Sequence, residues 1–337
     1  MKKASIFAVA TAATFLAGSA YAGTLDDVKA KGFIQCGVTT GLAGFAAPND
    51  KGVWEGFDVD FCRAMSAAIF ADPDKVKYTP LTSKERFTAL QSGEIDVLAR
   101  NTTWTFSRDV NLGFEFIGVN YYDGQGFMVK KSLDVKSATE LDGARVCLQA
   151  GTTTELNLAD YFALKGMSYD SVLFDNADEV REAYLKDTCD VYTTDQSGLY
   201  AQRSVVPNPD NHIVLPEIIS KEPLGPLVRH GDNNWGDIAR WTLNALIIAE
   251  ELGVTQANLE EMKSSKNPAV ARLLGVSGDL GSQLGLKAEW AANAIGSVGN
   301  YGEVFEKHIG MSTNLKIERG LNQLWNKGGI LYAPPAR

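Results

Sequence analysis

T-A-L-Q-S-G-E-I-D-V, at residues 88–97, has the pattern of a helix end, a tight turn, an aspartate and a strand. The segment E-A-Y-L-K-D-T-C-D-V, at residues 182–191, has the same outline. Asn101 and Asp195 stand at equivalent positions in the loops after the two strands. The match predicts two similar lobes whose loops face each other, although coincidence among common α/β patterns is the alternative.

Strands and helices alternate around both segments. In the first half we expect strands at 33–38, 76–80 and 95–99 and helices at 57–70 and 84–91. In the second half we expect strands at 144–148, 172–174 and 190–193, a helix from about 152 and another at 178–186. This order predicts an α/β fold in which each lobe is a mostly parallel sheet flanked by helices.

Two extended stretches connect the predicted lobes. They are Y-Y-D-G-Q-G-F-M-V (121–129) and I-I-S-K-E-P-L-G-P-L-V (218–228), where the residues before Pro223 and Pro226 disfavour helix. The chain would leave lobe 1, build lobe 2 and return. We therefore assign 23–122 and 225–337 to lobe 1 and 123–224 to lobe 2. A long helix at 235–252 and a largely helical tail ending at 315–326 complete the prediction.

The first 22 residues have the pattern of a cleaved signal peptide. Lys2 and Lys3 precede an apolar stretch at 6–17, and Ala20-Tyr21-Ala22 gives a small-x-small cleavage site. A transmembrane anchor is the alternative, but the stretch is shorter than about 18 residues. Residue 23 is Gly rather than Cys, so the sequence predicts an exported protein that is not a lipoprotein.

Composition excludes several classes of partner. The remaining 315 residues carry 30 basic and 41 acidic side chains, a net charge near −11. Such a chain repels nucleic acid and anionic membranes, so we expect neither nucleic-acid binding nor membrane insertion. With three scattered histidines and no C-x-x-C, neither a metal site nor a cofactor is predicted.

Four cysteines in an exported chain suggest disulfides, and they allow three pairings. The pairing Cys36–Cys62 and Cys147–Cys189 keeps each bridge within one predicted lobe, so we choose it. Four buried free thiols are the alternative.

Three polar loops are candidate binding segments. They are S-K-E-R (83–86), R-N-T-T-W-T-F-S-R (100–108) and Q-A-G-T-T-T-E (149–155). In the third, Thr152 and Glu155 have capping-box spacing. A helix start presents free N–H groups and a positive dipole end, which suit a carboxylate. A purely structural cap is the alternative.

Opposite charges on these loops suit a zwitterion. Arg108 can grip a carboxylate, Arg86 is a second cation, and Asp195 can accept from an ammonium group; surface ion pairs are the alternative for each arginine. Phe45, Trp54 and Trp104 could flank a ligand side chain or simply pack in the core. No nucleophile-elbow, metalloprotease, P-loop or dinucleotide motif is present. The sequence therefore predicts a binding protein and no enzyme.

The motifs G-F-D-V-D-F-C (56–62), L-Q-S-G-E-I-D (90–96), T-x-x-x-x-R (103–108) and G-T-T-T-E (151–155) resemble those of family 3 solute-binding proteins of polar amino acid ABC transporters. The resemblance covers nearly the whole chain after residue 22. It implies a two-lobed, type II periplasmic-binding-protein fold with two extended crossovers. It also implies a monomer in the periplasm that delivers an L-amino acid to the permease subunits of an ABC importer.

The resemblance also implies a role for each polar residue. Arg108 would hold the α-carboxylate with Thr152, and Asp195 would hold the α-ammonium with Asn101 and Thr103. Ser83 and Arg86 would meet the ligand side chain. Thr153, Trp104 and a lobe 2 position near 176–178 would complete the set. Broad specificity that includes glutamate, aspartate and glutamine is implied.

A free amino acid is so small that tight binding requires enclosure. Micromolar affinity approaches the limit of binding energy per atom. A low-dielectric cleft strengthens each charge pair, so we expect the lobes to close over the ligand by a hinge motion. An enzyme on the same fold, such as a periplasmic dehydratase or cell-wall lyase, and a tethered sensor module are the rival functions.

Overall fold

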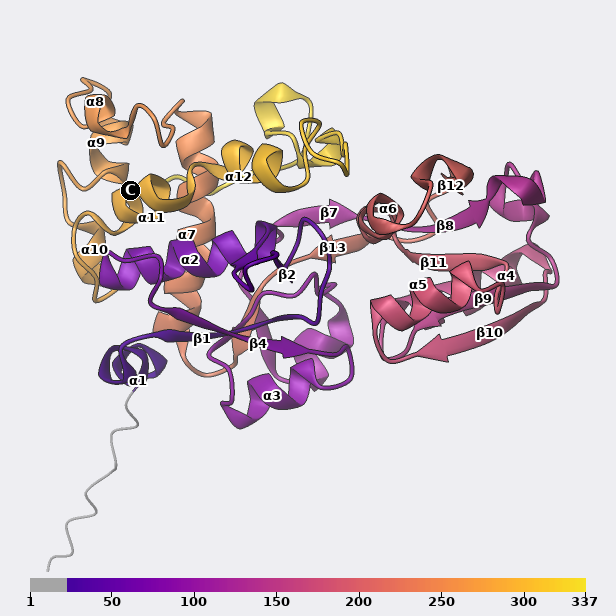
Figure 1. Cartoon of the computed structure of the whole chain (residues 1–337). Helices are drawn as coiled ribbons and strands as arrows, with labels where there is room; N and C mark the ends of the chain where they lie inside the picture. Colours follow the sequence, from indigo (N-terminus) through magenta and orange to yellow (C-terminus); the bar gives the residue numbers. More distant parts are fainter. Residues whose placement is uncertain (1–22) are drawn as a thin grey trace, which may run out of the picture.

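The computed structural model describes residues 23–337, so the predicted signal peptide lies outside the described residues. Figure 1 shows two sheets in separate lobes, joined by the strands β7 (Tyr121–Asp123) and β13 (Glu222–Leu224). Each of the two main sheets has five strands. The predicted two-lobed α/β fold is confirmed. Within residues 23–337, no helix is both long and apolar enough to cross a bilayer.

The first sheet contains four strands that run in one direction and an inserted antiparallel one. Its order is β4 (Val76–Leu81), β1 (Ile34–Thr39), β5 (Val97–Leu98), β14 (Leu227–Arg229) and β6 (Phe114–Phe116). β1 runs parallel to both β4 and β5, whereas β14 runs antiparallel to β5 and β6. The antiparallel strand, β14, follows the returning crossover, and its direction makes the sheet mixed.

The second sheet repeats this arrangement. Its order is β10 (Tyr169–Phe174), β9 (Ala144–Gln149), β11 (Val191–Asp195), β8 (Gln125–Lys130) and β12 (His212–Val214). Here β8, the strand that follows the outgoing crossover, is the antiparallel insertion. β5 and β11, which follow the two similar sequence segments, occupy the same place in their sheets.

Helices flank both sheets at the predicted positions, except for α6, which the apolar pattern did not predict. α2 (Phe57–Phe70) has the predicted bounds and is buried along most of its length. The other helices that frame the site are α3 (Arg86–Ser92), α4 (Thr153–Lys165), α5 (Ala177–Leu185) and α6 (Gln196–Val205). α7 (Asn233–Glu251) lies close to the predicted 235–252 and packs against α2 in the larger core.

The two crossovers pair with each other between the lobes. β7 (Tyr121–Asp123) is antiparallel to β13 (Glu222–Leu224), and the predicted domain boundaries fall in or beside these strands. The backbone of β13 also bonds to the loop after β5. Trp104 N–H donates to the Pro223 carbonyl (2.8 Å), and Gly225 N–H donates to the Thr102 carbonyl (3.0 Å).

The C-terminal segment differs from the predicted helix at 315–326. It has only the 3₁₀ turns η5 (Gly320–Asn322) and η6 (Trp325–Lys327). Lys316 and Gly320 adopt φ values of 51° and 46°, which interrupt a right-handed helix. The segment instead attaches to the crossover, because the Asn322 side chain bonds to both the N–H (2.7 Å) and the carbonyl (3.1 Å) of Tyr122.

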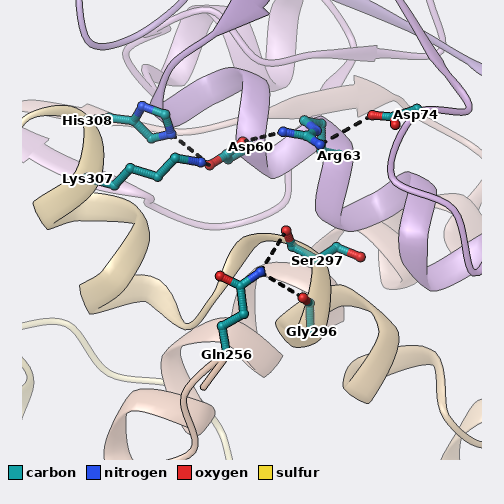
Figure 2. A network of polar contacts seen from close by, with 8 residues as sticks. All are labelled: Asp60, Arg63, Asp74, Gln256, Gly296, Ser297, Lys307 and His308. Atoms are coloured by element: carbon teal, nitrogen blue, oxygen red, sulfur yellow. Dashed lines mark hydrogen bonds and ion pairs between the residues drawn. The ribbon is translucent and has the colours of Figure 1, made fainter. Parts of the chain in front are cut away.

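Polar contacts fasten the C-terminal helices to lobe 1 (Figure 2). The buried Asp60 on α2 accepts from Lys307 (2.9 Å) and His308 Nε2 (2.7 Å), both on α12 (Tyr301–His308). Burial by itself raises the pKa of Asp60, but the bonds and charges of His308 and Lys307 bring it below its ordinary value. Gln256 ties the loop after α7 to α11 (Trp290–Val298) through the carbonyls of Gly296 and Ser297.

Both predicted disulfides are confirmed. Cys36 on β1 is bonded to Cys62 on α2, and Cys147 on β9 is bonded to Cys189 before β11. Each bridge joins elements of a single sheet and its covering helices, as the pairing by lobe predicted.

Candidate functional site

Three buried arginines of lobe 1 lie close to one another and to Asp195 of lobe 2. Arg86 begins α3, Arg100 follows β5, and Arg108 lies in the π-helical turn η1 (Ser107–Asn111). Their exposed fractions are 2%, 3% and 8%. Within residues 23–337 none of the three forms an ion pair with a carboxylate. Three charges are thus removed from water without a protein counter-ion beside them.

Neutral groups hold the three guanidinium groups. Arg100 donates to the Leu81 carbonyl (2.9 Å) and to Ser83 Oγ (3.0 Å). Arg108 donates from Nη1 to the Thr103 carbonyl (2.9 Å). Arg86 donates from Nη1 to Thr102 Oγ1 (3.2 Å), whereas its buried Nε has no partner.

The ring of Phe87 orients two of these cations. The guanidinium carbons of Arg86 and Arg108 lie 4.8 Å and 5.2 Å from its centroid. Burial and the neighbouring positive charges lower the pKa of Arg86 well below its usual range, against the attraction of Asp195. Burial likewise lowers the pKa of Arg100 to about 10, which leaves it charged at neutral pH.

Asp195 supplies the opposing charge from lobe 2. It ends β11 and precedes α6, it is 6% exposed, and its carboxylate has no hydrogen bond or ion pair within residues 23–337. Burial raises its pKa well above the ordinary value, and Asp123 and Glu222 add to that rise, while Arg108 and Arg86 oppose it. The two arginines and this aspartate therefore share one electrostatic environment, as the sequence predicted.

Unpartnered acceptors lie on both sides of the cleft. Asn101 has a φ of 30°, and its backbone N–H donates to Asp58 (3.0 Å), while its Oδ1 is buried without a partner. Gln125, the register partner of Asp195, has an unpartnered Oε1. Burial raises the pKa of Asp58 from 3.8 to about 6. Together with Asp195, these oxygens suit a ligand that donates hydrogen bonds.

The start of α4 differs from the predicted capping box. Thr152 is the N-cap, but its hydroxyl donates to the Gln149 carbonyl (2.8 Å) instead of accepting from the helix. Glu155 reaches back one residue further and accepts from Gly151 N–H (2.8 Å). No side chain caps the first turn, so its N–H groups can still receive an anion.

Glu222 is a buried acid that the sequence analysis missed. It lies on β13, is 1% exposed, and accepts hydrogen bonds from the hydroxyls of Thr103 (2.5 Å) and Thr153 (3.0 Å). Asn157 (2.6 Å) and Ser220 (2.7 Å) donate to its other oxygen. The hydroxyls of Thr103 and Thr153 therefore already donate to Glu222, so toward any other group they can act only as hydrogen-bond acceptors.

The lobes touch each other across the cleft. Lys84 of lobe 1 pairs with Asp175 of lobe 2 (2.6 Å), and the hydroxyl oxygens of Thr103 and Thr153 are 3.4 Å apart. Both side chains of this ion pair are exposed, so the pair shows that the lobes are in contact but contributes little to the stability of the closed form. The structure represents a closed arrangement.

The aromatic candidates and the 176–178 segment make contacts of other kinds. Phe45 is buried against Phe57 and Tyr121 in the core, and the half-buried Trp54 packs on Tyr78. Trp104 stacks on Phe116 at 5.4 Å and keeps 38% of its surface exposed. In the 176–178 segment, Asn176 caps α5 by accepting from Glu179 N–H (2.9 Å).

Buried charges of both signs, held on facing loops, suit recognition of a small zwitterion. Guanidinium groups and a helix start can receive carboxylates, and Asp195 with the unpartnered amide oxygens can receive an ammonium group. Within residues 23–337, no group of three or more His, Cys, Asp or Glu side chains could hold a metal ion.

Comparison with known proteins places this geometry in context. The profile of bacterial extracellular solute-binding proteins, family 3, matches residues 34–267. The general L-amino acid-binding periplasmic protein AapJ of Rhizobium johnstonii is 65% identical over 323 residues, which cover 95% of each chain. The glutamate/glutamine/aspartate/asparagine-binding protein BztA of Rhodobacter capsulatus is 57% identical over 338 residues, which cover 100% of each chain.

A solved structure extends the similarity to three dimensions. It is an ABC transporter / periplasmic binding protein from Brucella ovis with glutathione bound. The two chains are 61% identical and superpose with a TM-score of 0.92 over 94% of this chain and 100% of that one.

Proposed function

Because this chain belongs to family 3 of the bacterial extracellular solute-binding proteins, we propose that it is the periplasmic amino-acid receptor of an ABC importer. Proteins of this family bind and deliver solutes and are not enzymes. The observation that carries the proposal is the set of buried, unpaired charges on facing lobes: Arg86 and Arg108 on one side and Asp195 on the other. A zwitterion would neutralise both signs at once.

Each end of the ligand has a matching set of groups. Arg108 and the first-turn N–H groups of α4 are the proposed partners of the α-carboxylate. Asp195, Asn101 and the lone pairs of Thr103 and Thr153 are the proposed partners of the α-ammonium. Thr152 then contributes its backbone, because its hydroxyl is already bonded to Gln149.

Two buried guanidinium groups, those of Arg86 and Arg108, favour ligands with a second carboxylate. The α-carboxylate occupies the guanidinium of Arg108, so Arg86 is free to meet a carboxylate on the ligand side chain. Arg100, which donates to Ser83 Oγ, lies close to Arg86. Glutamate, aspartate and glutamine fit this arrangement within a broader set of L-amino acids. BztA is named for glutamate, glutamine, aspartate and asparagine, and glutathione, the ligand of the Brucella ovis protein, also carries two carboxylates.

The partner implied by the family is an ABC permease that recognises the closed receptor. We propose that the protein acts as a monomer, since one chain contributes both lobes of the site. We also propose export with removal of residues 1–22 and no lipid attachment, because Gly23 occupies the position that a lipoprotein gives to Cys.

Two measurements test the function. Mass spectrometry of small molecules released from the purified, denatured protein should identify amino acids, with the acidic ones prominent. Calorimetry should then show that Arg108→Ala weakens their binding by roughly 30-fold or more, because removing one partner of a buried charge pair costs about 2–5 kcal/mol. Arg203→Ala, on α6 beside Tyr200, is the matched control and should bind like wild type. Binding unchanged in Arg108→Ala would contradict the carboxylate assignment.

A further inference from the structure

Glu222 receives hydrogen bonds from both lobes at the point where they meet. Its Oε2 accepts from Thr103 on the lobe 1 loop and from Thr153, the first residue of α4 in lobe 2. Its Oε1 accepts from Asn157, one helical turn further along α4. No basic side chain lies within ion-pair distance of Glu222 in residues 23–337, so neutral donors make all of its hydrogen bonds, and Arg108 attracts it from further away.

The backbone assigns Glu222 to one side of the hinge. Pro223 and Gly225, which follow Glu222, are bonded to Trp104 and Thr102 of lobe 1, whereas Ile219 and Ser220, which precede it, are bonded to Gln125 of lobe 2. Thr103 itself forms a bridge with Leu224, so we expect β13 to move with Thr103 and lobe 1. Thr153 and Asn157 belong to α4, which packs on the sheet of lobe 2. Opening the cleft moves α4 away from β13, so the bonds that must break are those from Thr153 and Asn157.

The first turn of α4 is also a favourable place for a negative charge. The helix has 13 residues, and Thr153 and Asn157 share one face at i, i+4 spacing. The carboxylate is bonded to Thr153, the first residue of the helix, and so lies beside the positive end of the helix dipole. Closure thus brings a fixed anion against a site that attracts anions.

We propose that Glu222 is an inter-lobe latch that stabilises the closed form of the receptor through Thr153 and Asn157. The proposal rests on the proposed function, since it concerns closure over the ligand. The latch does not depend on the side chain of the bound amino acid. Loss of the latch should therefore weaken the binding of every ligand by the same factor. A change at Arg86 should affect ligands unequally, because Arg86 meets only the ligand side chain.

The variant Asn157→Ala removes one latch bond at a half-buried position of α4 and leaves the buried carboxylate in place. The matched control is Ser220→Ala, which removes a bond of similar length (2.7 Å, against 2.6 Å for Asn157) to the same oxygen, Glu222 Oε1. Ser220 lies two residues from Glu222 on the same crossover, so its bond to Glu222 is local, and its Oγ also accepts from Gln125 N–H (3.1 Å) at the start of β8. Ligand release is measured by stopped-flow fluorescence and affinity by calorimetry, for glutamate and glutamine.

Asn157→Ala should release both amino acids about 10-fold faster, as expected for loss of one hydrogen bond to a charged group. Its ligand-free melting temperature should equal that of wild type. Ser220→Ala should keep the wild-type release rate, and Asn157→Ala should have no further effect in a Glu222→Ala background. Equal release rates for Asn157→Ala and wild type, or equal effects of Asn157→Ala and Ser220→Ala, overturn the latch.

Small-angle scattering of ligand-free protein separates this proposal from the proposed function. Asn157→Ala should have the larger radius of gyration, because the open form becomes more populated. Wild-type protein that binds no amino acid refutes the proposed function. The latch is then judged by scattering alone, where equal radii refute it.

Discussion

Replacing Arg86 with methionine should make the protein more stable and less able to bind glutamate. Arg86 is 2% exposed, donates one hydrogen bond to Thr102, and has a buried Nε without a partner. Arg100 and Arg108 add like-charge repulsion. Methionine has a similar length, can pack against Phe87, and carries no charge. Arg86→Met therefore removes an electrostatic cost from the closed, ligand-free protein.

The two effects have different sizes and opposite signs. Replacing a buried, poorly compensated charge with an apolar side chain commonly stabilises a protein by about 1–4 kcal/mol. Losing the buried partner of a ligand carboxylate costs about 2–5 kcal/mol of binding energy, which weakens glutamate roughly 30- to 4000-fold. Glutamine has no side-chain carboxylate, so its affinity should fall much less. The preference for glutamate over glutamine should drop by about tenfold or more.

Calorimetry with both ligands and urea unfolding of ligand-free protein measure these quantities. Arg86→Lys is the control that keeps the charge but loses the planar fork, and it should retain part of the glutamate preference. An equal loss of glutamate and glutamine binding in Arg86→Met would show that Arg86 does not meet the side-chain carboxylate. A less stable ligand-free variant would show that the buried charge is compensated in a way that the geometry does not reveal.

Three further substitutions test the physical account of the fold. The pKa of Asp58 in the folded protein is raised to about 6, so wild type should lose stability as pH rises from about 4 to 7. Asp58→Asn does not titrate and should lack this part of the pH dependence, while its amide loses one of the two hydrogen bonds that the carboxylate accepts from Asn101 N–H and Asn120; identical pH profiles in urea unfolding would contradict this. The pKa of Asp60 is lowered in the folded protein, so its contribution to the free energy of unfolding is present at neutral pH and is lost in acid. Asp60→Asn should destabilise the protein by about 2 kcal/mol near pH 7 and by little once wild-type Asp60 is protonated. Melting temperatures of wild type and variant, measured from pH 7 into acid, would show this convergence. A Cβ at Gly225 would lie 2.0 Å from the Gly118 carbonyl oxygen, so the backbone of the crossover would have to shift in Gly225→Ala. We expect this variant to be about 1–3 kcal/mol less stable in thermal unfolding. An unchanged melting temperature would contradict the prediction.

The sequence predicted the regular elements better than the crossovers and the tail. α2 has strong helical periodicity and was placed to the residue, and both disulfides followed from the assignment of cysteines to lobes. The extended stretch at 218–228, in contrast, contains two strands, β13 and β14, in different sheets. Three-residue strands are too short to show a period, so only their extended character could be predicted.

The site shows the same division between local and long-range information. Arg86, Arg108 and Asp195 could be proposed because each follows or begins a predicted element at one edge of a sheet. Arg100 stands in the same quoted loop, but its inward hydrogen bonds to Leu81 and Ser83 depend on tertiary packing. Glu222 is 119 residues from Thr103, and nothing in its local sequence distinguishes it from Glu217 nearby.

The unpaired charges explain why closure should depend on the ligand. Bringing the lobes together removes water from Arg86, Arg108 and Asp195, and each loses solvation that the protein does not replace with an ion pair. Closing without a zwitterion is therefore opposed by electrostatics, whereas closing over one converts the same groups into buried charge pairs. The Glu222 bonds form in either case, so they reduce the opposing free energy without abolishing it. A receptor that must both capture a ligand tightly and release it to a transporter needs this balance, because a closed form that was stable by itself would exclude ligand from the open cleft.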